Sequence, residues 1–323
     1  MRVRAAVVLP VPVLLLAAAC GGGGGSKPAP ALSKAEAQRV LARYADAANK
    51  AGQRLDGDAL AAVETDPQLA MDRAAFRLSR AARRPFTPVR FVKSVFYIPR
   101  LNGYPRWFAA DTVTSATPPG AAQPRTTRHA LVFTQAAAGA PWLLAASPHP
   151  GGDEMSRVRL DGDGYAQAVA PGASGLAVSP SRIGAAHAAL LSGGPQAPGA
   201  GVLAPGPQTT QSYNALRQAQ LGLRRNGVRL HTRFAPDSSP VYALRTKDGG
   251  ALVWYVLRQQ ERYRAARLGK LAVTGDLTGL APAKAARTRL DATVLVQYLA
   301  TVPASGHAAV GGMYRKAVAA KAS

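Results

Sequence analysis

The stretch that decides the fold is Val241-Tyr-Ala-Leu-Arg-Thr246, followed by Lys247-Asp-Gly-Gly250 and then by Ala251-Leu-Val-Trp-Tyr-Val-Leu257. Two runs of β-branched, aromatic and aliphatic residues flank a short turn that contains Asp-Gly-Gly. This combination is the sequence signal for an antiparallel hairpin. We therefore predict that two strands, joined by a tight turn, form a hairpin in the C-terminal half of the chain.

Further elements are expected on both sides of this hairpin. Apolar residues recur at spacings of three and four before it, which indicates an amphipathic helix. Runs rich in β-branched residues indicate additional strands. The elements predicted around the hairpin are a helix over 210–225 and strands over 228–234, 270–274 and 292–302.

The N-terminal half shows a similar succession of helices and strands. Ser33 and Glu36 have the spacing of a capping box, which predicts a helix that begins there. Asp66-Pro67 is typical of a second helix start, where Asp66 and the nearby Glu64 would serve as ordinary capping acids. The strands expected after these helices cover 89–98, 105–113, 129–135 and 142–146.

The chain is therefore predicted to be an α+β protein with two tandem domains, each made of helices packed on a curved antiparallel sheet. The two halves could be internal repeats or two unrelated α+β domains, since no sustained identity links them. The expected division is a signal peptide over 1–20, a Gly/Pro tether over 21–32, an N-terminal domain over 33–165, a Pro/Gly-rich junction over 166–207 with a short helix near 180–192, a C-terminal domain over 208–315, and a basic tail over 316–323.

Three segments carry a resemblance to known proteins. They are Tyr104-Pro-Arg-Trp-Phe108, Ala140-Pro-Trp-Leu-Leu144, and Tyr242-Ala-Leu-Arg-Thr246 with Gly249-Gly250-Ala251. With these motifs the mature chain resembles an actinobacterial exported lipoprotein family of unknown function, and its halves resemble NTF2-like or cystatin-like domains. The resemblance implies helices on curved antiparallel sheets, and it implies no activity.

The first twenty residues have the features of an export signal. Arg2 and Arg4 precede an apolar run over 5–19, which is too short for a membrane-spanning helix but suits a secretory signal. Ala17-Ala-Ala-Cys20 resembles a lipobox, although Leu16 lies one position further from the cysteine than usual. We expect acyl chains such as palmitate on Cys20 to hold the protein at the cell membrane, on its extracytoplasmic face.

The chain is strongly basic, with a formal net charge of +23. A positive field favours anionic partners such as lipid headgroups and wall polymers. Nucleic acid is not an expected partner, because export separates the protein from it and the sequence carries no nucleic-acid-binding signature. A GC-rich coding sequence would also yield abundant arginine, so compositional drift is an alternative origin of the charge.

The sequence offers few groups for catalysis or for metal binding. Its five histidines are dispersed, and neither H-E-x-x-H nor C-x-x-C occurs. The acidic run Asp161-Gly-Asp-Gly164 is interpreted as a solvated turn rather than a calcium loop, because Gly172 stands where the bidentate Glu would be. No G-x-S-x-G elbow, P-loop or dinucleotide fingerprint is present. We therefore expect no metal and no cofactor.

One pair of residues suggests acid–base chemistry. Asp111 and His129 lie on consecutive predicted strands, and some NTF2-like enzymes hold an Asp and a His in their pocket. An exposed cross-strand ion pair is the alternative interpretation of the same two residues. The sequence leaves an NTF2-like exported hydrolase open as a hypothesis.

Five aromatic residues could line apolar clefts between helix and sheet, or could simply form core. They are Tyr44, Trp107, Trp142, Trp254 and Tyr255. With few catalytic groups available, the sequence favours a non-catalytic binding or scaffolding module that contacts an envelope protein or an apolar ligand. A basic surface protein that binds anionic wall polymer or headgroups is a further alternative.

The lipid attachment predicts the behaviour of a Cys20→Ser variant. Each buried CH₂ group of an acyl chain contributes about 0.8 kcal/mol, so two or three chains anchor a protein almost permanently. The variant should appear in the culture medium or accumulate as precursor, as immunoblots of cell fractions would show. A variant that is processed normally and stays with the membrane would contradict the assignment.

Overall fold

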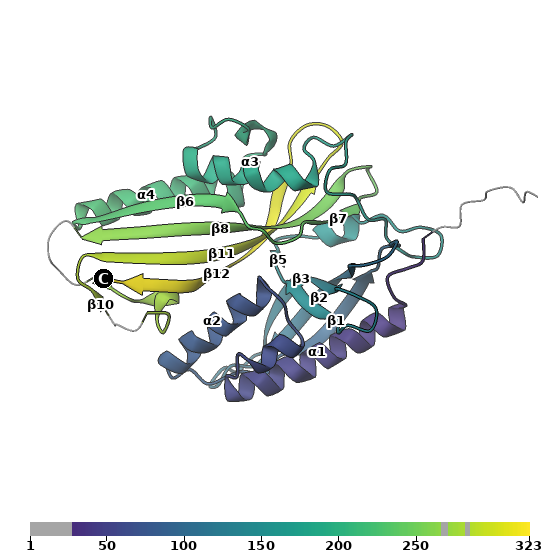
Figure 1. Cartoon of the computed structure of the whole chain (residues 1–323), viewed down its shortest axis with the longest axis horizontal. Helices are drawn as coiled ribbons and strands as arrows, with labels where there is room; N and C mark the ends of the chain where they lie inside the picture. Colours follow the sequence, from purple (N-terminus) through teal and green to yellow (C-terminus); the bar gives the residue numbers. More distant parts are fainter. Residues whose placement is uncertain (1–27, 266–270, 282–284) are drawn as a thin grey trace, which may run out of the picture.

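The computed structural model describes residues 28–265, 271–281 and 285–323. The described residues form two large antiparallel sheets, with helices packed on their faces (Figure 1). The predicted α+β class with antiparallel sheets is therefore confirmed.

The first helix, α1 (Lys34–Arg54), begins at the predicted capping box. Ser33 Oγ accepts a hydrogen bond from the Glu36 amide at 3.2 Å, and the Glu36 carboxylate accepts one from the Ser33 amide at 2.7 Å. Two amides at the helix start that lack intrahelical partners are thereby satisfied. The helix ends at Leu55, which takes the left-handed conformation with a φ of 51°.

The second helix, α2 (Gln68–Ala81), follows Asp66-Pro67 as predicted. The N-cap residue is Pro67, one position later than predicted, but Asp66 Oδ1 still accepts a hydrogen bond from the Ala70 amide of the first turn at 3.1 Å. The buried Met71 of this helix packs against Val256 and Leu295, so α2 lies on the second sheet.

The first sheet has four strands in the order β1-β2-β3-β4. One face packs against α1, and on that face the Phe108 and Phe133 rings stack with their centroids 5.1 Å apart. The predicted strands all form, and the two central ones are longer than expected because their threonine-rich ends continue the pairing. Their bounds are β1 Arg90–Tyr97, β2 Arg106–Ala116, β3 Arg125–Gln135 and β4 Leu143–Ala146.

The second sheet has the order β5-β12-β11-β8-β6, with β7 also paired to β8. A separate two-stranded pair lies beside it, formed by β9 (Leu271–Ala272) and β10 (Ala285–Ala286). The strands of the large sheet are β5 His149–Pro150, β6 Val228–Pro236, β7 Tyr242–Arg245, β8 Ala251–Ala265, β11 Arg289–Val302 and β12 Ala309–Ala322.

The predicted hairpin forms, with β7 paired to β8 on the side away from β11. The Thr246 amide donates to the Gly250 carbonyl at 3.0 Å, and Gly249 has a φ of 81°, a conformation that favours glycine. Strand β8 continues well beyond its predicted end at Leu257. The apolar pattern stops there because the next inward-facing residues, such as Glu261, are polar.

Helices α3 (Pro180–Gly193) and α4 (Ser212–Arg225) lie together beside the second sheet (Figure 1). The start of α3 at Ser179-Pro180 agrees with the short helix predicted in the junction. Its buried His187 makes a hydrogen bond to the Tyr255 hydroxyl at 2.8 Å. The remaining short turns are 3₁₀ turns at Ala59–Ala62, Glu154–Arg157, Ala200–Val202 and Gly275–Leu277, and a π turn at Pro207–Gln211.

The two sheets meet in a common core. The indole N–H of the buried Trp254, in β8, donates to the Ala130 carbonyl, in β3, at 3.0 Å. Trp107 of β2 lies against Tyr242 of β7, with ring centroids 5.1 Å apart. Strand β5, from the N-terminal half of the sequence, also pairs with β12. The division into tandem domains stays a prediction, but core residues from both sides of the predicted junction are in direct contact.

The basic tail expected over 316–323 is not a tail. Residues up to Ala322 belong to β12 and pair with β11 along almost its whole length. Lys316 and Lys321 flank four small or apolar residues, of which Ala317 is buried. The positive charges at its two ends make this strand segment resemble a solvated tail in the sequence.

Candidate functional site

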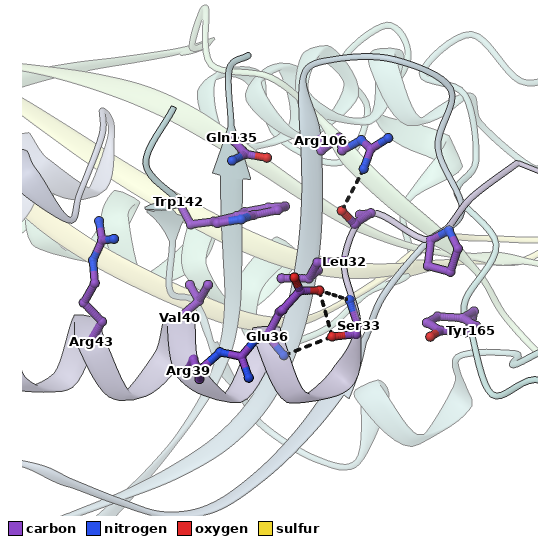
Figure 2. A pocket seen from close by; sticks show the side chains of 12 residues that line it. Leu32, Ser33, Glu36, Arg39, Val40, Arg43, Arg106, Gln135, Trp142 and Tyr165 are labelled. Carbon is purple, nitrogen blue, oxygen red and sulfur yellow. Dashed lines mark hydrogen bonds between the residues drawn. The ribbon is translucent and has the colours of Figure 1, made fainter. Parts of the chain in front are cut away.

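An open pocket of about 720 Å³ lies where the described chain enters the first sheet (Figure 2). Its floor and walls come from segments that are separated in sequence. Helix α1 contributes Glu36, Arg39 and Arg43, β2 contributes Arg106, and Trp142 precedes β4. The folding of the first sheet against α1 is therefore what creates the pocket.

Trp142 lies at the centre of this arginine-lined pocket. Figure 2 shows its indole ring between Gln135 and Val40, with Arg43 projecting from α1 towards the level of the ring and Arg39 lying along the helix beside Glu36. The edge of the ring packs against Phe108 of the core at 5.2 Å between centroids. The indole is thus fixed by the core, while Trp142 itself is only partly buried.

The three arginines carry more charge than the pocket neutralises. Glu36 is its acidic residue, and its carboxylate is engaged by Ser33, whose backbone and side-chain hydrogen bonds lower the pKa of Glu36. Arg106 donates from Nη1 to the Ala31 carbonyl at 3.2 Å, whereas its buried Nε has no hydrogen-bond partner among the described residues. None of Arg39, Arg43 and Arg106 forms an ion pair within the described part of the chain.

The other aromatic residues that the sequence suggested as pocket lining lie in the interior. Trp107, Trp254 and Tyr255 are buried, and Tyr255 lies in the core beneath α3. Tyr44 is half-buried between α1 and the first sheet, with its ring against Phe133. Of the five aromatics, Trp142 is the one that borders a described pocket. The surroundings of this ring include arginines, so the pocket is not the purely apolar cleft that the sequence suggested.

The structure does not bring Asp111 and His129 together as an acid–base pair. In the β2–β3 register Asp111 is opposite Ala130 and His129 is opposite Thr112, so the two side chains point to opposite faces of the sheet. Asp111 forms a bidentate pair with Arg128, at 2.7 and 2.6 Å. His129 instead contacts Thr114 Oγ1 and Ser147 Oγ, both at 3.0 Å.

A polar network that sequence reasoning missed lies between α2 and the two sheets. Gln297 of β11 accepts a hydrogen bond from the Ser147 amide at 2.7 Å and donates to Gln68 of α2 at 3.0 Å. Gln68 in turn donates to Asp72 at 2.8 Å. Tyr44 donates to the buried Glu64 at 3.3 Å. Glu64 had been interpreted as a capping acid, and nothing in its local sequence distinguishes it from Asp66, which is one.

Burial controls the ionisation of this network. Removal from water, reinforced by the neighbouring Asp72 carboxyl, raises the pKa of Glu64 to about 10. Burial also raises the pKa of Asp72. His129 changes in the opposite sense, because burial and the adjacent His149 lower its pKa to about 4. At neutral pH the network therefore holds a protonated Glu64 and an uncharged His129.

The acidic turn at 161–164 is held by an arginine. Asp161 accepts a hydrogen bond from Arg100 Nε at 2.7 Å, and Asp163 pairs with the same guanidinium. Within the described ranges, no group of three or more His, Cys, Asp or Glu residues could hold a metal ion. No described helix is long and apolar enough to span a bilayer.

Comparisons with known proteins show the family. The chain belongs to the family described as Domain of unknown function (DUF8094), which matches residues 28–322. An uncharacterized lipoprotein of Streptomyces avermitilis is 31% identical over 242 residues, covering 74% of this chain and 69% of the relative. Two uncharacterized lipoproteins of Streptomyces coelicolor are 31% identical over 246 residues, covering 74% and 70% of the two chains, and 28% identical over 286 residues, covering 86% and 79%. No solved structure matches the chain.

The resemblance to an actinobacterial lipoprotein family of unknown function is thereby confirmed. The family match begins at residue 28, the first described residue, and includes all the residues that form the pocket. The residues that line the pocket thus lie within the matched region.

The ionisation of Glu64 predicts a pH-dependent stability. A carboxyl with a raised pKa binds its proton more tightly in the folded state, so stability falls as pH rises from about 4.5 to about 10. The free energy of unfolding falls by at most about 1.4 kcal/mol for each pH unit in this range. Glu64→Gln should therefore raise the free energy of unfolding at pH 8 to 9 and flatten its pH dependence.

Urea titrations at pH 7, 8 and 9 measure this effect outside the range in which His129 titrates. Asp46→Asn, which removes an exposed carboxylate paired with Lys50 on α1, serves as control and should change stability by less than about 1 kcal/mol at each pH. Equal pH slopes for wild type and Glu64→Gln would show that Glu64 is not protonated in the folded protein.

Proposed function

We propose that this protein is a non-catalytic, membrane-anchored binding lipoprotein of the cell envelope, and that its arginine-lined pocket binds a small anionic ligand. The observation that carries the proposal is the grouping of Arg39, Arg43 and Arg106 around the fixed ring of Trp142. The relatives are named as lipoproteins, which supports lipid attachment at Cys20 on the extracytoplasmic face.

The chemistry of the pocket favours a ligand that combines a ring with a phosphate or carboxylate group. Guanidinium groups present several donors in a planar fork and suit such anions. The buried Nε of Arg106 is a donor for which the described chain supplies no acceptor. An anion in the pocket would be bound by the terminal Nη donors of Arg106, of which Nη1 makes one hydrogen bond, to the Ala31 carbonyl. The Trp142 ring offers a flat apolar surface beside the arginines.

The position of the pocket fits a ligand at the membrane surface. Pro30 and Ala31 form part of its lining, and Cys20 precedes Pro30 by ten residues. A fully extended chain of that length spans about 35 Å. A lipid on Cys20 would therefore keep the pocket close to the outer face of the membrane.

The non-catalytic interpretation rests on what the pocket contains. Its titratable groups are arginines, Tyr165 and a carboxylate used in helix capping, and this set provides no evident general base. The packing of α1 on a four-stranded antiparallel sheet supports the proposed likeness of the N-terminal half to NTF2-like or cystatin-like domains. Binding rather than turnover is the function that we propose for this scaffold.

Glucose 6-phosphate, which joins a ring to a phosphate, is a suitable probe of the pocket. We expect its binding to change the tryptophan emission through Trp142, since Trp107 and Trp254 are buried elsewhere. Arg39→Gln combined with Arg43→Gln should weaken binding at least tenfold, because hydrogen bonds to charged groups contribute about 1.5–3 kcal/mol each.

Arg84→Gln, which removes an exposed arginine beyond the end of α2, serves as control and should leave the affinity unchanged. In Trp142→Phe the fluorescence response should vanish, while calorimetry still detects binding. An absence of binding at millimolar concentrations of glucose 6-phosphate, inorganic phosphate and acetate would contradict the proposal, as would equal affinities for the double variant and the control.

A further inference from the structure

A second basic surface lies on the far part of the large sheet, where β6, β8 and β11 continue beyond the common core (Figure 1). In the antiparallel register Arg229 of β6 is opposite Arg264 of β8, and Arg264 is opposite Arg289 of β11. Residues opposite one another in a sheet point to the same face. Three arginines therefore form a row across three neighbouring strands, about 4.8 Å from one strand to the next.

The next two rows on the same face add three cationic side chains, Arg262, Lys321 and Arg233, beside Asp291 and uncharged residues. His231, Arg262, Asp291 and Lys321 follow one another across β6, β8, β11 and β12. The row after it begins with Arg233. These rows lie on the face opposite to Phe234, which packs into the hydrophobic cluster under α3, and Leu290, which packs into the cluster with β9 and β10.

This surface contains far more positive than negative charge. Asp291 pairs with Arg262 at 3.0 Å and with Arg289 at 2.6 Å, so one carboxylate serves two arginines. Arg229, Arg233 and Arg264 are exposed and form no ion pair within the described part of the chain. We define the distal basic face as Arg229, Arg233, Arg262, Arg264, Arg289 and Lys321.

The charge continues around the edge of the sheet onto α4. Arg217 and Arg224 of this helix, together with Arg229 and His231, line an open groove of about 540 Å³ along the edge strand β6. Helix α4 contains no acidic residue that could neutralise them. The groove and the distal basic face thus form one continuous positive surface.

Like charges directly opposite one another on neighbouring strands destabilise a sheet. Compositional drift explains scattered surface arginines, but it does not favour three of them in register. An anionic partner with several charges would relieve the repulsion, and the rows repeat about every 6.8 Å along each strand. An extended polyanion, rather than a single small anion, matches this flat and repeating arrangement.

We propose that the distal basic face binds an anionic phosphate-bearing polymer of the cell wall. The choice of a wall polymer over headgroups rests on the proposed function, since it assumes an anchor at Cys20. Figure 1 shows the N-terminal end of the described chain and the far ends of β6, β8 and β11 at opposite ends of the longest axis. With the lipid at one end, the basic face is free to point away from the membrane.

The test compares two variants that lose the same charge from different places. Arg229→Gln, Arg233→Gln and Arg264→Gln together remove the unpaired arginines of the distal basic face. Arg39→Gln, Arg43→Gln and Arg84→Gln together form the control, which also disables the pocket. Binding to long-chain linear polyphosphate is measured between 50 and 200 mM salt, alongside binding to phosphatidylglycerol vesicles.

The distal variant should lose at least tenfold in affinity for polyphosphate, and its slope of log affinity against log salt should become shallower by about 2. The control should bind polyphosphate within threefold of wild type, even though its pocket is disabled. Equal losses of polyphosphate affinity in both variants would show that binding depends on net charge and not on the distal basic face, which would overturn the proposal. A distal variant that loses only vesicle binding would also overturn it, in favour of headgroups.

A stability measurement keeps this result separate from misfolding. Because the distal variant removes like-charge repulsion, its thermal midpoint should equal or exceed that of the wild type. A lowered midpoint would show that these arginines stabilise the sheet, which contradicts the reason given for a polyanionic partner. Loss of glucose 6-phosphate binding in the control alone would concern the pocket and leave the distal basic face unaffected.

Discussion

The packing of the first sheet against the second is the constraint on which the rest of the structure depends. Trp254 of β8 is buried where the two sheets meet, and its indole N–H reaches the Ala130 carbonyl of β3. A buried indole needs such a partner, so this hydrogen bond also fixes the register in which the sheets meet. Leu299 of β11 packs in the same cluster, beside Trp107 and Val132 of the first sheet.

Both candidate binding surfaces follow from this arrangement. With one face of the first sheet committed to the second sheet, α1 covers the other face and creates the pocket around Trp142. The long strands of the second sheet extend past the common core, and that extension exposes the distal basic face. The buried network that includes Glu64 and Gln297 lies between these regions and ties α2 to both sheets.

The local patterns in the sequence predicted much of the secondary structure. The capping box at Ser33, the hairpin turn at Gly249-Gly250 and the strands that flank it all form, because short-range geometry and hydrogen bonding determine them. Strand β8 was predicted too short, since its inward residues beyond Leu257 are polar and pair with one another. The segment over 316–323 resembles a basic tail in sequence because its two lysines conceal the apolar run between them.

The sites were less predictable than the strands. Trp142 was a candidate, but its companions Arg39 and Arg106 are far apart in sequence and come together only when α1 packs on the sheet. Asp111 and His129 seemed close because their strands are consecutive, yet an offset of one residue in register sends their side chains to opposite faces. Likewise, the row formed by Arg229, Arg264 and Arg289 depends on pairings that the sequence does not state.

The most direct test of the common core is hydrogen exchange after Leu299→Ala, with the exposed Leu221→Ala as control. We predict that Leu299→Ala lowers the stability by about 2–5 kcal/mol and reduces protection equally in β3 and in β8, whereas the control changes it by less than about 0.5 kcal/mol. Loss of protection in the second sheet alone, with β3 unchanged, would show that the halves unfold as independent domains and would contradict this account.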